Sequence, residues 1–290
     1  MKNKNKKKAS KTRVLLRLSG KFLAKLFAES YYLTNLCRLT VQIHDNDLNA
    51  NFNENGELFL LQHMANISNS NSVFIDVGAN KGDYSVELIK AGITGKLFLI
   101  DPIIKNLRIA KQKILNLNFN NFEIIECALS NSTGRKNFYT NIDPKSSSES
   151  DSMYDMKLIG YSNKQKKTKV QVKKLYNIMR QSKIKRIHFL KIDVEGNEFN
   201  VLKGAENYLN NGRIRFIQFE FGNAAKAARI YLHDIIFLLE PKQYKMFIIK
   251  PRGLMELKFT VFYEKRYSYI NLLAVHKNSI KSISDIIIKN

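Results

Sequence analysis

The sequence lacks several features that would assign it at once to a class of protein. It has no apolar stretch near the ~18–20 uncharged residues that a membrane-spanning helix needs. Its two cysteines, Cys37 and Cys127, are too few for a disulfide framework. No histidine stands three or four residues from another, so a histidine-rich metal site is not expected. No segment repeats along the chain.

Positive charge is what the chain has in excess. Its 290 residues carry a formal net charge of +23, and 44% of them are hydrophobic, enough for a sizeable core. Such a charge favours acidic partners: anionic lipid, nucleic acid or an acidic glycan. A general bias toward Lys and Asn is the alternative source of part of this excess.

The N-terminus concentrates this charge. Residues 1–13 carry seven Lys or Arg and no acid, and basic residues then recur every four positions at Arg13, Arg17, Lys21 and Lys25. This spacing predicts a basic amphipathic helix, which either lies on a membrane surface or packs on the domain. The cations interrupt the apolar run, so the segment is a poor secretory signal. We expect a cytoplasmic protein whose residues 1–28 contact anionic membrane peripherally.

Strand and helix patterns alternate regularly from residue 73 onward. This alternation predicts an α/β fold with a doubly wound, mostly parallel sheet and helices on both faces. The expected strands are 73–77, 96–101, 121–127, 187–193, 214–220, 244–250 and 269–276, and the expected helices are 57–67, 82–91, 104–117, 198–210 and 223–240. The expected parts are a basic tail and helix (1–30), a helical and irregular extension (31–72), the main domain (73–278) with an inserted loop (139–169), and a C-terminal tail (279–290).

The segment after the first strand carries the clearest functional signal. An apolar run ends in Asp76, and a turn with Gly78, Asn80 and Gly82 leads into a helical pattern. Loops at the carboxyl ends of strands are where open α/β sheets bind ligands. A dinucleotide fingerprint would have glycine where Asn80 stands, which favours a nucleoside without a pyrophosphate, such as S-adenosylmethionine. The alternative is an ordinary turn that binds nothing.

Three later strands also end in carboxylates. Asp101 is placed to accept hydrogen bonds from ribose hydroxyls or, alternatively, to cap the next helix. Asp193 and Glu195 follow another strand and share one direction in an extended chain. They could take a proton from a methyl acceptor, hold a divalent cation or cap a helix. Glu220 ends a further strand and would join the same rim.

Together these segments resemble the FkbM family of S-adenosylmethionine-dependent methyltransferases. The resemblance rests on FIDVGANKGDYS (74–85), IDP (100–102), ECALSNSTG (126–134), LKIDVEGNEFNVLKGAE (190–206) and IQFEFG (217–222). It implies a class I, Rossmann-like fold with about seven strands and methyl transfer, usually to a hydroxyl of a sugar, glycolipid or natural product. It places Asp76, Gly78, Asn80 and Gly82 around the methionine part of the cofactor, Asp101 at the ribose, and Asp193 and Glu195 at the transferred methyl.

The chain departs from the family pattern in two places. It has Asp101-Pro102 where members commonly have Glu-Pro, and Leu175-Tyr176 where they often have Leu-Asp. We therefore expect O-methylation of a sugar hydroxyl on a glycan, a glycolipid or a related metabolite, with S-adenosyl-L-methionine as cofactor and no assigned metal. The alternatives are an RNA methyltransferase on the same fold, which the lack of an aromatic-rich RNA module disfavours, and a non-catalytic nucleoside-binding protein.

Overall fold

The computed structural model describes residues 17–22, 24–25, 30–47, 49–142, 151–160, 164–257 and 269–288. The chain divides into two compact units, Met1–Asp47 and Leu48–Asn290. Among the described residues, no helix has the length and apolar character needed to cross a membrane. The second unit contains the sheet and every residue of the predicted site.

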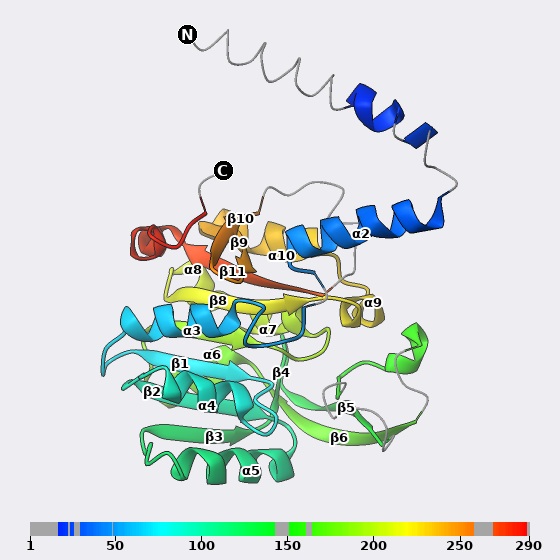
Figure 1. Ribbon diagram of the computed structural model, residues 1–290. Coiled ribbons are helices and arrows are strands. Elements are labelled where there is room, and N and C mark those ends of the chain that lie inside the picture. The colour runs from blue at the N-terminus through cyan, green and yellow to red at the C-terminus, as the bar shows by residue number, and fades with distance from the viewer. Residues whose placement is uncertain are drawn as a thin grey trace. The chain divides into compact units, whose positions relative to one another are not determined.

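The second unit is built on one large sheet (Figure 1). Its strand order is β10-β9-β11-β8-β7-β1-β2-β3. The bounds are β1 Val73–Val77, β2 Lys96–Asp101, β3 Phe122–Glu126, β7 Ile187–Ile192, β8 Ile214–Phe221, β9 Tyr244–Lys250, β10 Gly253–Glu256 and β11 Ile270–His276. The neighbouring strands β3, β2, β1, β7 and β8 run parallel to one another. Strand β11 pairs antiparallel with β8 and with β9, and β9 pairs antiparallel with β10. The predicted mostly parallel α/β sheet is confirmed, and β10 adds a short edge strand.

Helices cover both faces of this sheet (Figure 1). One face buries Leu60 of α3 (Glu57–Asn66), Leu88 of α4 (Asp83–Lys90) and Leu107 of α5 (Ile104–Leu115). The other face packs against α6 (Leu175–Gln181), α7 (Glu198–Gly204), α8 (Glu206–Asn210) and α10 (Leu232–Leu239). Because both faces are covered, central strands such as β1 and β7 are buried along their whole length, which explains why most of their residues are apolar.

Two predicted helices are each divided in the structure. The 198–210 pattern forms α7 and α8 with a break at Ala205. The 223–240 pattern forms α9 (Ala224–Ala228) and α10, because Arg229 adopts a left-handed conformation (φ 57°) that ends the first helix. The apolar spacing continues through both breaks, so it gave no sign of them.

The prediction of an inserted loop at 139–169 is wrong for both ends of this segment. These ends belong to strands of a second, three-stranded sheet. This sheet has the order β4-β6-β5 and consists of β4 (Ala128–Leu129), β5 (Gly134–Asn141) and β6 (Gln165–Lys173). Alternate residues of β5 and β6 face a small core with Phe138, Val170 and Val172. The many lysines of β6 lie on exposed positions and hid this alternation. Residues 143–150 and 161–163 of the predicted loop lie outside the described residues.

The edges of the main domain also differ from the expected boundaries. The compact unit begins at Leu48 rather than at residue 73, because Leu60, Leu61 and Met64 of α3 are fully buried in the sheet's core. The expected tail from residue 279 is mostly packed. A 3₁₀ helix spans Lys277–Ile283, Ile283 is fully buried, and Ile287 forms a β-bridge with Leu254.

The first unit contains two described helical stretches. Residues 17–22 and 24–25 are helical, in agreement with the predicted basic helix, whose other residues lie outside the described part. Helix α2 (Tyr31–Asp45) begins after Ser30, whose hydroxyl accepts from the Leu33 N–H at 3.4 Å. It ends at Asn46 in a left-handed conformation.

Candidate active site

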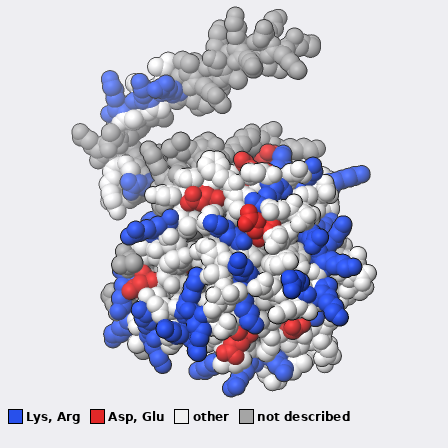
Figure 2. Space-filling view, turned by 180° about the vertical axis from the view of Figure 1, so that it is seen from behind, with Lys and Arg blue, Asp and Glu red and all other residues white. Residues whose placement is uncertain are grey.

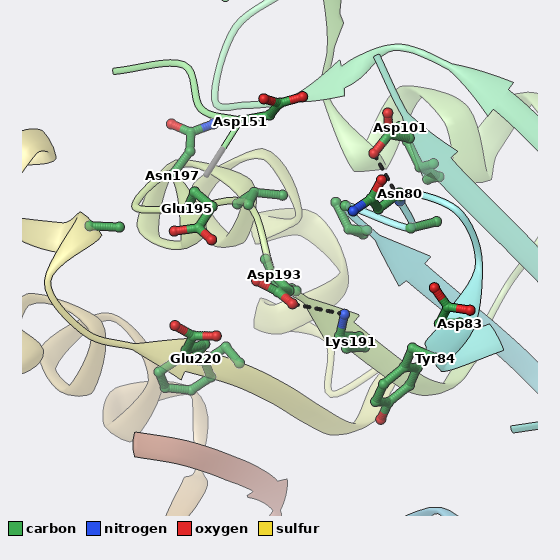
Figure 3. Close-up of a pocket in the computed structure, with 18 of the residues that line it drawn as sticks. Asn80, Asp83, Tyr84, Asp101, Asp151, Lys191, Asp193, Glu195, Asn197 and Glu220 are labelled. Carbon is green, nitrogen blue, oxygen red and sulfur yellow. Dashed lines mark hydrogen bonds and ion pairs between the residues drawn. The ribbon is translucent and has the colours of Figure 1, made fainter. Parts of the chain in front are cut away.

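A cavity of about 770 Å³ opens at the carboxyl ends of β1, β2, β7 and β8. This is the edge where parallel α/β sheets bind their ligands, and the size suits a drug-sized molecule. Five of the seven predicted site residues line it: Gly78, Asn80, Asp101, Asp193 and Glu195. Figure 3 shows Asn80 and Asp101 on one side and Asp193, Glu195 and Glu220 on another.

Asp76 and Gly82 lie outside the cavity lining and have structural contacts instead. Asp76 is 1% exposed, and one carboxylate oxygen accepts from the Ser85 hydroxyl at 2.7 Å. Its other oxygen lies 3.6 Å from Lys191 Nζ. Gly82 has φ 77°, and a Cβ there would stand 2.6 Å from Ala110 Cβ on α5. These two residues therefore fix the loop and the helix packing around the cavity.

Gly78 joins the two sides of the cavity. Its φ is 78°, and a Cβ would lie 1.7 Å from the Asp193 carbonyl oxygen. Only a residue without a side chain fits there, because the β1 and β7 loops touch through their backbones. Asn80 also has a positive φ of 46°, which Asn tolerates better than most residues. Its Oδ1 is buried and has no hydrogen-bond partner among the described residues.

Asp101 anchors the loop that follows β1. Its carboxylate accepts from the Asn80 N–H at 3.0 Å and from the Ile103 N–H at 2.8 Å. Burial raises its pKa to about 6, against the lowering effect of these two donors. The alternative prediction, that Asp101 caps the next helix, is wrong. The N-cap residue of α5 is Ile103, and Asp101 lies two residues earlier. Each carboxylate oxygen keeps acceptor capacity toward the cavity.

The turn after β7 is built on unusual backbone conformations. Glu195 has φ 51° and Gly196 has φ 99°, and a Cβ on Gly196 would lie 2.5 Å from the Ala224 carbonyl oxygen. Glu198, buried at the start of α7, accepts from the N–H groups of Val194 and Gly196 at 3.1 and 3.2 Å. Burial raises the pKa of Glu198 to about 7. Glu198 thus holds the turn that presents Asp193 and Glu195.

Lys191 is a site residue that the sequence reasoning missed, although it lies in the quoted LKIDVEG segment. Its Nζ donates to Asp193 Oδ2 at 3.1 Å and stands 4.6 Å from the centre of the Tyr84 ring (Figure 3). Burial opposes its charge, but the carboxylates of Asp193, Asp76 and Glu57 together raise its pKa. A lysine inside an apolar strand is itself a signal, because it stays buried only when it is paired.

A hydrogen-bonded chain runs from Tyr84, whose ring contacts Lys191, to helix α3. The Tyr84 hydroxyl donates to Gln218 Oε1 at 2.6 Å, and Gln218 Nε2 donates to Glu57 Oε1 at 2.6 Å. Asn55 Nδ2 donates to the other Glu57 oxygen at 2.7 Å. Burial raises the pKa of Glu57. Helix α4, strand β8 and helix α3 thus share one buried polar network beneath the cavity.

Residues 151–154 close another side of the cavity. The Ser152 hydroxyl donates to the Glu195 carbonyl oxygen at 2.6 Å. Asn197, 2% exposed, donates to the Leu129 carbonyl oxygen and accepts from the Tyr154 hydroxyl. Asp151 lines the cavity and accepts from the Asn141 N–H at 2.8 Å. The segment that the sequence marked as an insertion is therefore attached to the Asp193–Asn197 turn.

The β1–β2 side fits the expected cofactor. Gly78 leaves a bare backbone surface, Asn80 Oδ1 is a buried acceptor without a partner among the described residues, and Asp101 is an acceptor suited to a diol. S-adenosylmethionine carries an amine and a ribose diol that match such acceptors. Within the described residues, no group of three or more His, Cys, Asp or Glu is arranged to hold a metal ion.

The comparison with protein families identifies one domain in this chain. The model of the methyltransferase FkbM domain matches residues 76–246. No curated protein matches the chain. Among solved structures, an rRNA methylase from Streptococcus thermophilus is similar, with 12% identity, a TM-score of 0.39, and coverage of 76% of this chain and 95% of that one.

Two further solved structures resemble the chain to a similar degree. One is SMU.1697c, a putative methyltransferase from Streptococcus mutans in complex with SAH, with 10% identity, TM-score 0.40, and 76% and 97% of the two chains covered. The other is the precorrin-6y C5,15-methyltransferase from Geobacter metallireducens, with 10% identity, TM-score 0.38, and 76% and 87% covered. The family match spans more than half of the chain, so this chain belongs to the FkbM-domain family of S-adenosylmethionine-dependent methyltransferases.

Proposed function

We propose that this methyltransferase methylates a hydroxyl group of a glycan, a glycolipid or a related metabolite. The observation that carries the proposal is the concentration of carboxylates at the β7–β8 side of the cavity, where Asp193, Glu195 and Glu220 stand around one opening (Figure 3). Carboxylates are strong acceptors for hydroxyl groups, and several of them together suit an acceptor with many hydroxyls. This side is separate from Gly78, Asn80 and Asp101, which we assign to the cofactor.

The residues have distinct tasks in this proposal. S-adenosylmethionine, when bound, supplies a methyl group on a positively charged sulfur. Asp101 and Asn80 would hold it through the acceptors described above, with Asp76 and Gly82 supporting their loop. Asp193 and Glu195 would orient the acceptor hydroxyl and stabilise positive charge nearby. Most of the rate gain is expected from holding the reacting atoms about 3–3.5 Å apart in line.

RNA is the second candidate acceptor. The net charge of +23 and the many Lys and Arg side chains on the face in Figure 2 suit a phosphate backbone. The interior of the cavity opposes this choice, because the carboxylates of Asp193 and Glu195 would repel phosphates. Binding that falls steeply with salt and methyl transfer to an RNA fraction would establish RNA in place of a glycan.

The first unit supports a peripheral contact with an anionic membrane. Residues 1–25 contain ten Lys or Arg, each worth roughly 1 kcal/mol near such a surface. Leu18 and Phe22 are 60% and 64% exposed, and Tyr32, Leu36, Leu39 and Ile43 form an exposed apolar stripe along α2. Basic charge beside exposed apolar surface is typical of helices that lie in a lipid interface. A glycolipid acceptor would be delivered at that surface.

The acceptor is tested with labelled methyl groups. Purified protein and methyl-labelled cofactor are incubated with glycan, lipid and RNA fractions of the source cell. We expect label in the glycan or glycolipid fraction, at least tenfold less with Asp193→Asn or Glu195→Gln, and cofactor affinity within a few fold of the wild type. Label in RNA alone would contradict the proposal. Insensitivity to a chelator is expected if the carboxylates act without a metal.

The membrane contact is tested by deleting residues 1–28. Co-sedimentation with anionic vesicles should fall sharply in the truncated protein, while calorimetry should give an unchanged cofactor affinity. High salt should weaken the full-length protein's binding and leave a residual apolar contribution. Equal co-sedimentation of both proteins would remove the membrane from the proposal.

A further inference from the structure

The carboxylates that line the cavity differ in what already binds them. Asp101 accepts from two backbone N–H groups, and Asp151 accepts from one. Asp83 is ion-paired with Lys113, and Glu87 with Lys90. Glu57 accepts from two side-chain amides. Each of these groups therefore already has at least one donor or cation supplied by the protein.

Asp193, the residue first expected to take a proton, is bound to a cation. Its Oδ2 lies 3.1 Å from Lys191 Nζ, and Lys191 is almost completely buried. A buried ammonium group at this distance occupies one carboxylate oxygen of Asp193 and holds the side chain in place. Lys191 also stands 3.6 Å from Asp76 Oδ1, and this second contact fixes the ammonium group in place. Asp193 is therefore suited to orient a hydroxyl more than to remove its proton.

The surroundings of Glu220, at the end of β8, differ from those of Asp193. It lines the same cavity, and no described group donates a hydrogen bond to its carboxylate. The charges that act on it most strongly come from Asp193 and Glu195 in the turn after β7, with Glu198 and Glu57 next. From the other side, the residue before β11, Tyr269, is a neutral phenol whose own pKa is raised by burial and then by Glu220. Burial and these neighbouring carboxylates raise the pKa of Glu220 well above that of an ordinary glutamate.

We infer that Glu220 is the residue that accepts the proton from the acceptor hydroxyl, and that Lys191 is a positioning residue that holds the Asp193 carboxylate in place. The inference rests on the proposed O-methylation. As the hydroxyl oxygen bonds to the methyl carbon, the carbon–sulfur bond breaks and its electron pair returns to sulfur. The proton leaves the oxygen for the Glu220 carboxylate and later goes to solvent. Charge balances, because the sulfonium loses its positive charge and the carboxylate loses its negative charge.

The assignment is tested first without any acceptor. In full-length protein labelled with ¹³C at Asp and Glu carboxyl carbons, the signals of Glu220 and Asp193 are assigned by their loss in Glu220→Gln and Asp193→Asn. Titration should show Glu220 taking up its proton well above the range of an ordinary glutamate. In Lys191→Met, the carboxyl signal of Asp193 should shift at constant pH because its ion pair is lost, and Lys191→Arg should restore the signal in part. An ordinary glutamate pKa near 4.3 for Glu220 would overturn the inference.

The second test uses the fraction that receives methyl label from the wild type. Glu220→Gln should lose at least 100-fold in turnover while calorimetry with the demethylated cofactor product gives unchanged affinity. Glu220→Asp should keep part of the activity with a shifted pH profile. Full activity of Glu220→Gln together with loss in Glu195→Gln would move the role to Glu195. If no fraction takes up label, the proposed function fails, whereas the titration still decides whether the pKa of Glu220 is raised.

Discussion

The two sides of the cavity are built by different means. On the β1–β2 side, Asp101 is held by the N–H groups of Asn80 and Ile103, so the fixed partners are backbone atoms close in sequence or in the adjacent strand. On the β7–β8 side, Asp193 is held by the Lys191 side chain, within a network that reaches Gln218 and Glu57. In our proposal the first side receives the cofactor. The second side, where Asp193, Glu195 and Glu220 gather, receives the acceptor.

The largest expected effect comes from breaking the junction of the two sides. Gly78→Val would place a branched side chain against the Asp193 carbonyl at a left-handed φ, so we expect a loss of several kcal/mol in the free energy of unfolding and no cofactor binding. The cause is displacement of the two loops rather than occupation of cofactor space alone. Denaturant unfolding and calorimetry would measure both losses.

A matched control exists for this substitution. Gly92 also has a positive φ, of 98°, but a Cβ there would have no atom within 4 Å. Gly92→Val should therefore show the cost of the backbone conformation without the contact. If the two variants are equally stable and bind the cofactor equally, the junction has no structural importance.

The next effect separates cofactor binding from catalysis. Asp101→Ala removes a charged acceptor and leaves the Asn80 and Ile103 N–H groups without a partner, so we expect cofactor affinity to fall about 10–100-fold. Asp101→Asn, which keeps one acceptor oxygen, should lose less. Asp193→Asn should stay within a few fold of wild type in the same calorimetric titration. Unchanged affinity in Asp101→Ala would remove the assignment to the ribose.

A smaller effect concerns the pH dependence of stability on the β7 side. Since the pKa of Glu198 is raised to about 7 in the folded protein, its contribution to stability is present below about pH 4.5 and is lost as pH rises through 7. Glu198→Gln keeps an amide oxygen for the Val194 and Gly196 N–H groups and does not ionise. The variant should therefore be more stable than the wild type at pH 8 by about 1–2 kcal/mol. Denaturant midpoints at pH 5 and pH 8 would show whether the difference grows with pH, and a constant difference would contradict the assignment.

The smallest predicted change tests the link between Lys191 and helix α3. Tyr84→Phe removes the hydrogen bond to Gln218 and keeps the ring beneath Lys191 Nζ, so we expect a loss of about 1 kcal/mol in stability. Cofactor affinity should stay within twofold, because the contact lies in the network of the acceptor side. A large loss of affinity would show that the two sides are not separately built.

The prediction from sequence was best where a local pattern decided the structure. The strand ends of β1, β2 and β9 were placed correctly, because continuous apolar runs bounded by turn residues leave few alternatives. The strand β6 was missed, because its lysines occupy the exposed positions and the two buried valines are too few for a clear alternation. Gly78 and Asp101 could be placed at the cavity because each directly follows or ends a recognisable strand.

By itself the sequence determined the family, most strands of the main sheet, and the carboxylates at the ends of four strands. Only the tertiary structure decided what each carboxylate is bound to. Gln218 and Glu57 are 161 residues apart in sequence and 2.6 Å apart in space, and Lys191 meets Asp76 across two parallel strands. Such contacts depend on the packing of whole elements, and a carboxylate's basicity depends on its neighbours and burial rather than on its position in the chain. For that reason the sequence could only predict that Asp193 and Glu220 lie on one rim. The folded protein shows that Asp193 is paired with a buried lysine and that Glu220 lies among other carboxylates.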